Sequence, residues 1–265
     1  MRKPFMPAFL KPLLFAMLIM VLSLGSSCAR TVERNKVNSR RILFQFTVEG
    51  TLALSNPNVT YYIVVNAPKT PNVPIDEATQ GPRINGANVN LPNSALEGRL
   101  PFTNPPLGAD VESIWTHFYF IQGTADGKGT IGLGRKLDNG SIEIVQRNYA
   151  DALWSQTSPS SLQVQLLFSD LGYTDPATEA PSNLTFNLAT SDNFETGFGF
   201  VFDWWKGNLP FAVNTAATGT PISDNDITPN LVMRLIPGKP QPTLPTGVQA
   251  SQVNLIGYEY RVLEL

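Results

Sequence analysis

The sequence predicts an all-β domain, an antiparallel β-sandwich or jelly-roll-like fold with long proline-rich loops. Many short segments of alternating or continuous apolar residues recur along the chain, and turn-forming residues separate them. The regular alternation of strands with helices that a parallel sheet requires is not visible. The composition agrees, because 22 prolines and 20 glycines accompany only 15% charged residues in 265. Such a mixture suits short strands joined by irregular loops.

The first two expected strands lie at residues 41–49 and 60–65. Residues 41–49 alternate apolar and polar side chains, which is typical of a strand with one buried face. Residues 60–65 are apolar on both faces, which indicates a central strand. Residues 66–112 hold eight prolines, which leave no room for a helix or a long strand. Loops of this length carry function or are disordered, and we interpret this one as a stiffened excursion packed over one end of the sheet.

A three-stranded antiparallel meander is the clearest architecture in the sequence. Its strands are expected at 114–122, 130–137 and 141–147. The second connection is Asp138-Asn139-Gly140, and its Asn-Gly pair indicates a type I′ hairpin turn, because both residues tolerate positive φ. Residues 148–156 then fit one short helix.

Strand patterns continue through the rest of the chain. Further strands are expected at 162–168, 184–188, 197–205, 231–236 and 252–263. A proline-rich bridge, residues 237–247, precedes the last of these. One strand cannot bury itself, so this last segment must return to the sheet, and the bridge is not a domain linker.

The start of the chain predicts export. Residues 13–22 are an unbroken apolar run behind Arg2, Lys3 and Lys11, and small residues follow it. A basic segment, an apolar run of about 7–15 residues and small residues together form a secretory signal peptide. A membrane-spanning helix would need roughly 20 apolar residues. We therefore expect residues 1–27 to be a signal peptide.

The single cysteine of the sequence, Cys28, lies where this signal ends. Gly25-Ser26-Ser27-Cys28 resembles the lipobox of bacterial lipoproteins, although Gly25 stands where that family usually has Leu, Val or Ile. The resemblance implies that Cys28 is acylated and becomes the mature N-terminus, which would anchor the protein in a membrane at the periplasmic or outer cell surface. The alternative is cleavage after Ala29, which would discard the cysteine.

Charge divides the exported chain into a basic tether, residues 28–41, and a single acidic domain, residues 42–265. Residues 29–41 carry five basic side chains and one acidic side chain. They suit a flexible tether near anionic lipid headgroups or, alternatively, a solvated spacer without a partner. The domain carries 11 basic and 20 acidic residues, which argues against nucleic acid as a partner.

Several chemistries are disfavoured by what the sequence lacks. One cysteine permits no internal disulfide, and one histidine, His117, leaves no ligand set for zinc. We expect His117 to be a packed or surface side chain, since no Gly-x-Ser-x-Gly elbow accompanies it. Gly127-x-Gly129-x-x-Gly132 matches a dinucleotide fingerprint on paper, but a strand rather than a helix follows it. We interpret these residues as turn and bulge glycines, and we expect no cofactor.

Carboxylates are the remaining catalytic candidates. Asp192, Glu195 and Asp203 lie near an aromatic segment, and a glycosidase needs only two suitably spaced acids. No spacing singles out one pair. Asp224-Asn225-Asp226 offers oxygen ligands for Ca²⁺ but lacks the length and the glutamate of an EF-hand loop, so a polar turn is the preferred interpretation.

The aromatic segment at residues 197–208 is the most unusual stretch. Its first interpretation is a central core strand whose apolar face carries Phe198, Phe200, Phe202 and Trp204. Its second interpretation is a binding surface, in which Trp205 or Trp204 forms an exposed aromatic plate at the strand's end. The polar neighbours of that plate would be Asp203, Lys206 and Asn208, and it would stack a sugar or contact a protein partner.

These patterns together predict an exported, lipid-anchored β-sandwich protein with a binding or structural role at the bacterial cell envelope. Its expected partners are a membrane, through the lipid, and a glycan or an envelope protein. The alternative is a hydrolase of envelope or extracellular glycans that uses Asp203 or Glu195.

Overall fold

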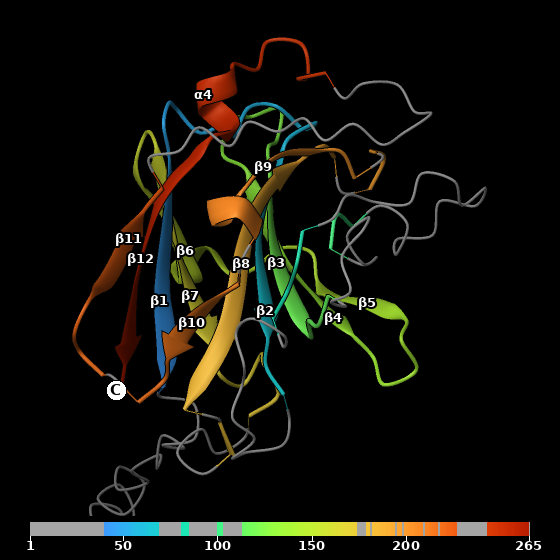
Figure 1. The fold of residues 1–265 in the computed structure, drawn as a ribbon. Helices are drawn as coiled ribbons and strands as arrows, with labels where there is room; N and C mark the ends of the chain where they lie inside the picture. The colour runs from blue at the N-terminus through green and yellow to red at the C-terminus, as the bar shows by residue number, and fades with distance from the viewer. Residues whose placement is uncertain are drawn as a thin grey trace, which may run out of the picture.

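The computed structural model is a β-sandwich of two antiparallel sheets packed face to face, which confirms the predicted fold class (Figure 1). The structure describes residues 40–68, 81–84, 100–102, 113–173, 179–180, 182–193, 195–197, 199–208, 210–216, 218–226 and 243–264. The expected signal peptide, Cys28, the tether as far as residue 39 and the expected strand 231–236 lie outside these residues. So do most of the stretch 66–112 and the first part of the bridge 237–247.

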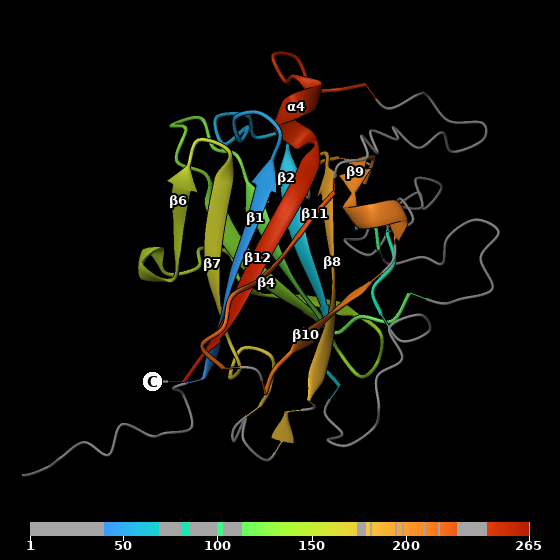
Figure 2. The ribbon, with the colours of Figure 1, turned by 60° about the vertical axis from the view of Figure 1, so that its left-hand side comes forward.

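The first sheet contains both ends of the described chain. Its strand order is β11 (Ile222–Asn225), β12 (Leu255–Leu263), β1 (Arg41–Val48), β7 (Ser161–Leu167) and β6 (Trp154–Ser158). In Figure 2 this sheet lies in front, with β7, β1 and β12 side by side. The prediction that the last strand returns to the sheet is confirmed, since β12 pairs along the whole of β1. The short helix α4 (Ala250–Val253) leads into β12.

The second sheet contains the predicted meander. Its strand order is β10 (Phe211–Asn214), β8 (Asn183–Ser191), β2 (Thr60–Asn66), β3 (His117–Gln122), β4 (Thr130–Lys136) and β5 (Ile142–Gln146), and β9 (Val201–Trp204) also pairs with β8. The strand β2 lies between β3 and β8 and is buried along its full length, as its two apolar faces predict.

The main core lies between the sheets, and alternation in the sequence builds it. Every second residue of β1 is buried, and Phe44 from this strand stacks on Phe186 of β8 with ring centroids 5.7 Å apart. Apolar area removed from water contributes about 25 cal/mol per Å². The contact between the two aromatic rings therefore helps to hold the sheets together.

A second core covers the outer face of the second sheet. Tyr62 and Phe118 contribute to it from the strands, and Ile84, Leu100 and Phe102 pack over them from the proline-rich stretch. The described parts of that stretch therefore cover a face of the sheet, rather than the end that the sequence suggested. Since this second sheet is covered on both faces, its strands need apolar residues at successive positions.

Two local predictions are wrong. The turn at 138–140 is not type I′, because Gly140 has a φ of +84° whereas Asn139 does not have positive φ. The three-residue connection between Leu137 and Ser141 uses a turn followed by one left-handed glycine. Residues 148–156 do not form one helix: a single 3₁₀ turn, η2 (Asp151–Leu153), leads directly into the edge strand β6.

Gly132 lies within β4 and is neither a turn nor a bulge residue, unlike the sequence prediction. It is paired with Phe120 on β3, and the aromatic ring lies across the glycine. A Cβ atom at this position would stand 2.0 Å from Cζ of Phe120. The expected turn roles are confirmed for Gly127 and Gly129, whose φ angles are +77° and +71°.

We expect Gly132→Ala to lower the free energy of unfolding by about 1–3 kcal/mol, because the ring of Phe120 must move within a packed core. Urea denaturation measures this change. The double variant Gly132→Ala/Phe120→Leu is the control, since a smaller side chain leaves room for the new methyl group. A single variant as stable as the parent would show that the ring does not constrain this position.

Candidate functional site

A β-bulge decides how the aromatic segment is oriented. Val201 is paired with Ser191 and Asp203 with Thr190, so Phe202 is an extra residue in β9. The bulge breaks the alternation of faces. As a result Phe202 packs in the core between the sheets, whereas Trp204 packs against the second core on the outer face. The expected single face shared by Phe202 and Trp204 is wrong for this reason.

Trp205 is not the exposed plate that the sequence suggested. It begins the 3₁₀ turn η3 (Trp205–Asn208) and is only 1% exposed. Its indole contacts Tyr258 and Phe211 edge to face, with centroids 4.9 and 6.2 Å away. Trp204 is partly buried. The bulge and the turn together direct Trp205 into the interior.

The acidic candidates of two distant segments meet beside this turn. We call Asp203, Lys206, Asp224 and Asp226 the carboxylate joint. The ammonium of Lys206 pairs with the carboxylate of Asp224, and its backbone N–H donates to Oδ2 of Asp226 over 2.9 Å. Lys206 has a φ of +31°, and these contacts hold that unusual backbone in place. Sequence analysis assigned unrelated roles to Asp203 and Asp226, but the structure brings their charges close enough to interact.

Asp203 links the two sheets. Its Oδ2 accepts a 2.7 Å hydrogen bond from the backbone N–H of Leu255, the first residue of β12. The other oxygen, Oδ1, is buried and accepts no well-aligned hydrogen bond from any described residue. Burial, together with the nearby charge of Asp226, raises the pKa of Asp203 from 3.8 to about 7, although backbone N–H groups offset part of the effect.

Asp203 has the pKa of a general acid, but its carboxyl group is not exposed as that of a general acid would be. Asp203 and Asp226 are 1% and 3% exposed, so a substrate does not reach them in this conformation. Within the part of the chain that the structure describes, no group of three His, Cys, Asp or Glu side chains could hold a metal ion. Asn208, the last of the expected plate residues, ends η3. The joint therefore fastens β9 to β12.

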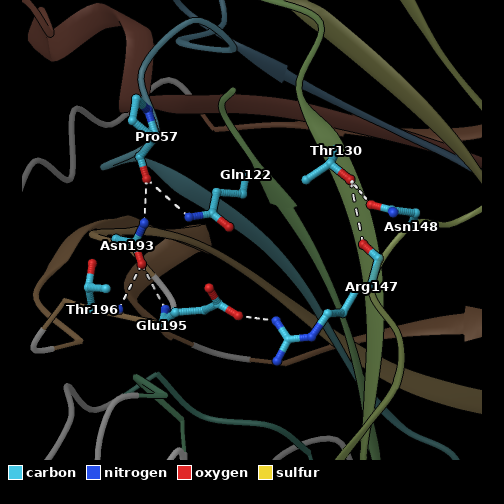
Figure 3. Close-up of polar contacts among 8 residues, drawn as sticks. All are labelled: Pro57, Gln122, Thr130, Arg147, Asn148, Asn193, Glu195 and Thr196. Carbon is cyan, nitrogen blue, oxygen red and sulfur yellow. Dashed lines mark hydrogen bonds and ion pairs between the residues drawn. The ribbon is translucent and has the colours of Figure 1, made fainter. Parts of the chain in front are cut away.

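Glu195, the other catalytic candidate, belongs to a different network (Figure 3). Its carboxylate forms an ion pair with Arg147, and both side chains are exposed. The loop that carries it is held by Asn193, whose Oδ1 accepts hydrogen bonds from the backbone of Glu195 and Thr196 and whose Nδ2 donates to the carbonyl of Pro57. Glu195 and Asp203 share no hydrogen bond or ion pair, so the structure does not assemble them as a pair.

Asp192 and His117 have local partners. An oxygen of Asp192 accepts a hydrogen bond from the backbone N–H of Gly199 over 2.9 Å. His117 is packed, as expected, and its Nδ1 lies 2.9 Å from the hydroxyl of Thr116. It also lines a cavity of about 440 Å³ beside Arg135 and Lys136.

A larger groove of about 880 Å³ lies where β6, the edge of the first sheet, faces the β3–β4 connection of the second. We call it the β6 groove. It is lined by residues 124–130, 148–149 and 154–156. The partly buried Trp154 lines it, and the exposed Gln156 lies on the same face of β6, two residues further along the strand.

Hydrogen bonds within the β3–β4 connection hold the opposite wall of the groove. The hydroxyl of Thr124 donates to Asp126 over 2.5 Å and accepts from the backbone N–H of Gly129 over 2.9 Å. The hydroxyl of Thr124 is also the main reason why the pKa of Asp126 is lowered. This wall is therefore fixed before any ligand arrives.

Sequence reasoning missed the β6 groove because it assigned a helix to residues 148–156. The strand Trp154–Ser158 carries polar side chains after its tryptophan, and an edge strand of this kind shows no apolar alternation. The signal that could have located it is Ser158-Pro159, which ends a strand before β7 as readily as it ends a helix.

Comparison with protein-family models, with curated proteins and with solved structures finds no match to this chain. In the described residues, no helix has the length and apolar character needed to cross a membrane. The function of this chain is therefore inferred from its own geometry and chemistry.

Proposed function

We propose that this protein is exported, acylated at Cys28 and held at the bacterial cell envelope, where its β-sandwich binds a partner and does not catalyse a reaction. The anchor rests on the sequence of residues 1–28. The binding role rests on one observation in the structure, the β6 groove, which combines an aromatic ring, amide and hydroxyl groups and fixed walls. Such concave sites with few convergent polar groups are the usual ligand sites of proteins.

The groove contains one carboxylate, Asp126, whereas hydrolysis of a glycosidic bond needs two. The acids that were candidates for catalysis are committed to other contacts: Asp203 to Leu255, and Glu195 to Arg147. These positions favour binding over the alternative of a glycan hydrolase. The pKa of about 7 at Asp203 is the single feature that favours the alternative.

Simple energetics explain how acyl chains on Cys28 would hold the protein on a membrane. Each acyl CH₂ that enters a membrane contributes about 0.8 kcal/mol, and stable anchoring requires more than one chain. A diacylated Cys28 would meet this requirement. The basic residues that follow it would add attraction to anionic headgroups.

We expect Cys28→Ser to release the protein from membranes into the soluble fraction when it is expressed in a bacterium that processes lipoproteins. Fractionation and mass spectrometry of the mature N-terminus measure the change. Ser26→Ala is the matched control, because it alters the same junction but keeps the cysteine, and it should remain in the membrane fraction. If the mature parent protein begins at Arg30, or keeps its signal peptide, the anchor is ruled out.

The binding role is tested with the same soluble Cys28→Ser protein, because it has no anchor to hold it. We expect it to sediment with washed cell envelopes of the expressing strain. Adding Asn148→Ala and Gln156→Ala should reduce that retention. A protein that stays in the supernatant, or that sediments equally with and without the groove substitutions, would contradict binding through the groove. Sugar release from the same envelopes would instead support the hydrolase.

A further inference from the structure

We infer that the β6 groove takes an uncharged glycan chain, with Trp154 against a sugar ring and the amides and hydroxyls beside it bonded to sugar hydroxyls. This inference rests on the proposed binding function and names the ligand class of the same site. Its volume of about 880 Å³ lies toward the upper end of the range for small-ligand sites, so it suits several linked rings rather than one.

The hydrogen-bonding capacity of the groove is largely unused. Oε1 of Gln156 accepts no hydrogen bond from any described residue, and Nδ2 of Asn148 donates none. The other side of each amide is engaged, since Oδ1 of Asn148 accepts from Thr130 over 3.0 Å and Nε2 of Gln156 donates to the carbonyl of Pro159 over 3.2 Å. Each amide is thus oriented with one polar atom available.

The available groups match hydroxyls better than they match charged groups. A hydroxyl both donates and accepts, so it can pair with the amide N–H of Asn148 and with the amide oxygen of Gln156. Each face of a sugar ring also presents C–H groups, which stack on an aromatic plate. Trp154 supplies that plate, whereas its indole N–H is buried and makes no hydrogen bond to any described residue.

The charges beside the groove favour an uncharged ligand. Lys128 and Asp126 lie two residues apart on the same connection, so their opposite charges largely cancel. The groove therefore presents no net positive charge that would attract a polyanion. An acidic glycan or a phosphate chain is therefore a poorer fit than a neutral one.

The walls need little rearrangement to receive such a chain. The β3–β4 connection is held by its own hydrogen bonds, and β6 is fixed by its pairing with β7 from Trp154 to Ser158. Fixed walls reduce the entropy cost of binding, which is large for a flexible polymer. The groove also lies at a sheet edge, beside the last strand of the first sheet.

The test uses the full mature protein in detergent with two neutral oligosaccharide series, one of β-1,4-linked N-acetylglucosamine and one of α-1,4-linked glucose. We expect at least one series to bind, with affinity that rises with chain length, when titrated by calorimetry and tryptophan fluorescence. Gln156→Ala and Asn148→Ala should each weaken binding by about tenfold, the effect of losing one or two net hydrogen bonds. Gln163→Ala, on the neighbouring strand outside the groove, is the matched control and should bind like the parent.

Trp154→Phe tests the ring without deleting its packing against the main core. It should weaken binding and remove the fluorescence change, while its melting temperature stays near that of the parent. Failure of both series, equal binding by the groove variants, or preferential binding of heparin or an unfolded polypeptide would overturn the neutral-glycan inference. If the groove variants still lose retention on envelopes in that case, the binding function stands and only the ligand class is wrong.

Discussion

Trp205→Ala is expected to lower the free energy of unfolding by about 3–5 kcal/mol, the usual cost of deleting a fully buried large aromatic side chain. The indole is 1% exposed and lies edge to face with Tyr258, whose ring stacks on Phe211 at 4.2 Å. Truncation removes burial and leaves a cavity between rings on strands of both sheets. The surrounding side chains are large and rigid, so the cavity will not close readily.

Urea denaturation of Trp205→Ala and Trp204→Ala measures the difference between adjacent tryptophans. Trp204 is only partly buried, so its truncation should cost less. The order of the two variants is the informative result. A Trp205→Ala protein that is as stable as the parent would mean that this side chain faces solvent, and the exposed plate expected from the sequence would return as a hypothesis.

The strands of the core could be predicted because their residues repeat with the period of a strand. Alternation predicts the strand at residues 41–49, and strand-like segments with turn residues between them predict the meander from residue 114 onward. The pairing within the meander follows from its short connections. Pairing between distant segments was predictable only in one case. The final strand had to return to the sheet because no other segment could bury it.

The candidate site was predicted less well, and each error has a physical cause. A bulge at Phe202 cannot be seen in the sequence, yet it reverses the faces of the residues after it. The strand β6 escaped detection because the polar edge of a sheet lacks alternation. The contact between Asp203 and Asp226 depends on how β9 and β11 are placed by different sheets, which local patterns do not encode.

The protein is expected to lose stability as pH rises from about 4 to about 7, because of Asp203. Its pKa is 3.8 in the unfolded chain and about 7 in the folded protein. Between these values the folded state keeps a proton that the unfolded state has released, so raising the pH favours unfolding. Below the lower value both states are protonated, and above the upper value the loss is complete. A shift of this size corresponds to a loss on the order of 4 kcal/mol.

Asp203→Asn separates this effect from other titrations. Burial also raises the pKa of Asp170, which adds to the slope with the same sign, whereas the exposed Asp126 has a lowered pKa and acts with the opposite sign. An asparagine keeps an acceptor for the N–H of Leu255 but cannot ionise. The variant should therefore match the parent more closely at pH 5 and be the more stable protein at pH 8.

The measurement is urea denaturation of the parent and the variant at intervals from pH 4 to pH 8. Asp224→Asn is the matched control, because it makes the same substitution at an exposed carboxylate of the joint and shows what the chemical change alone does to stability. Parallel curves for the parent and Asp203→Asn would show that Asp203 is ionised throughout this range. Its burial would then be offset by a partner, and the link from β9 to β12 would be an ordinary charged hydrogen bond rather than a protonated one.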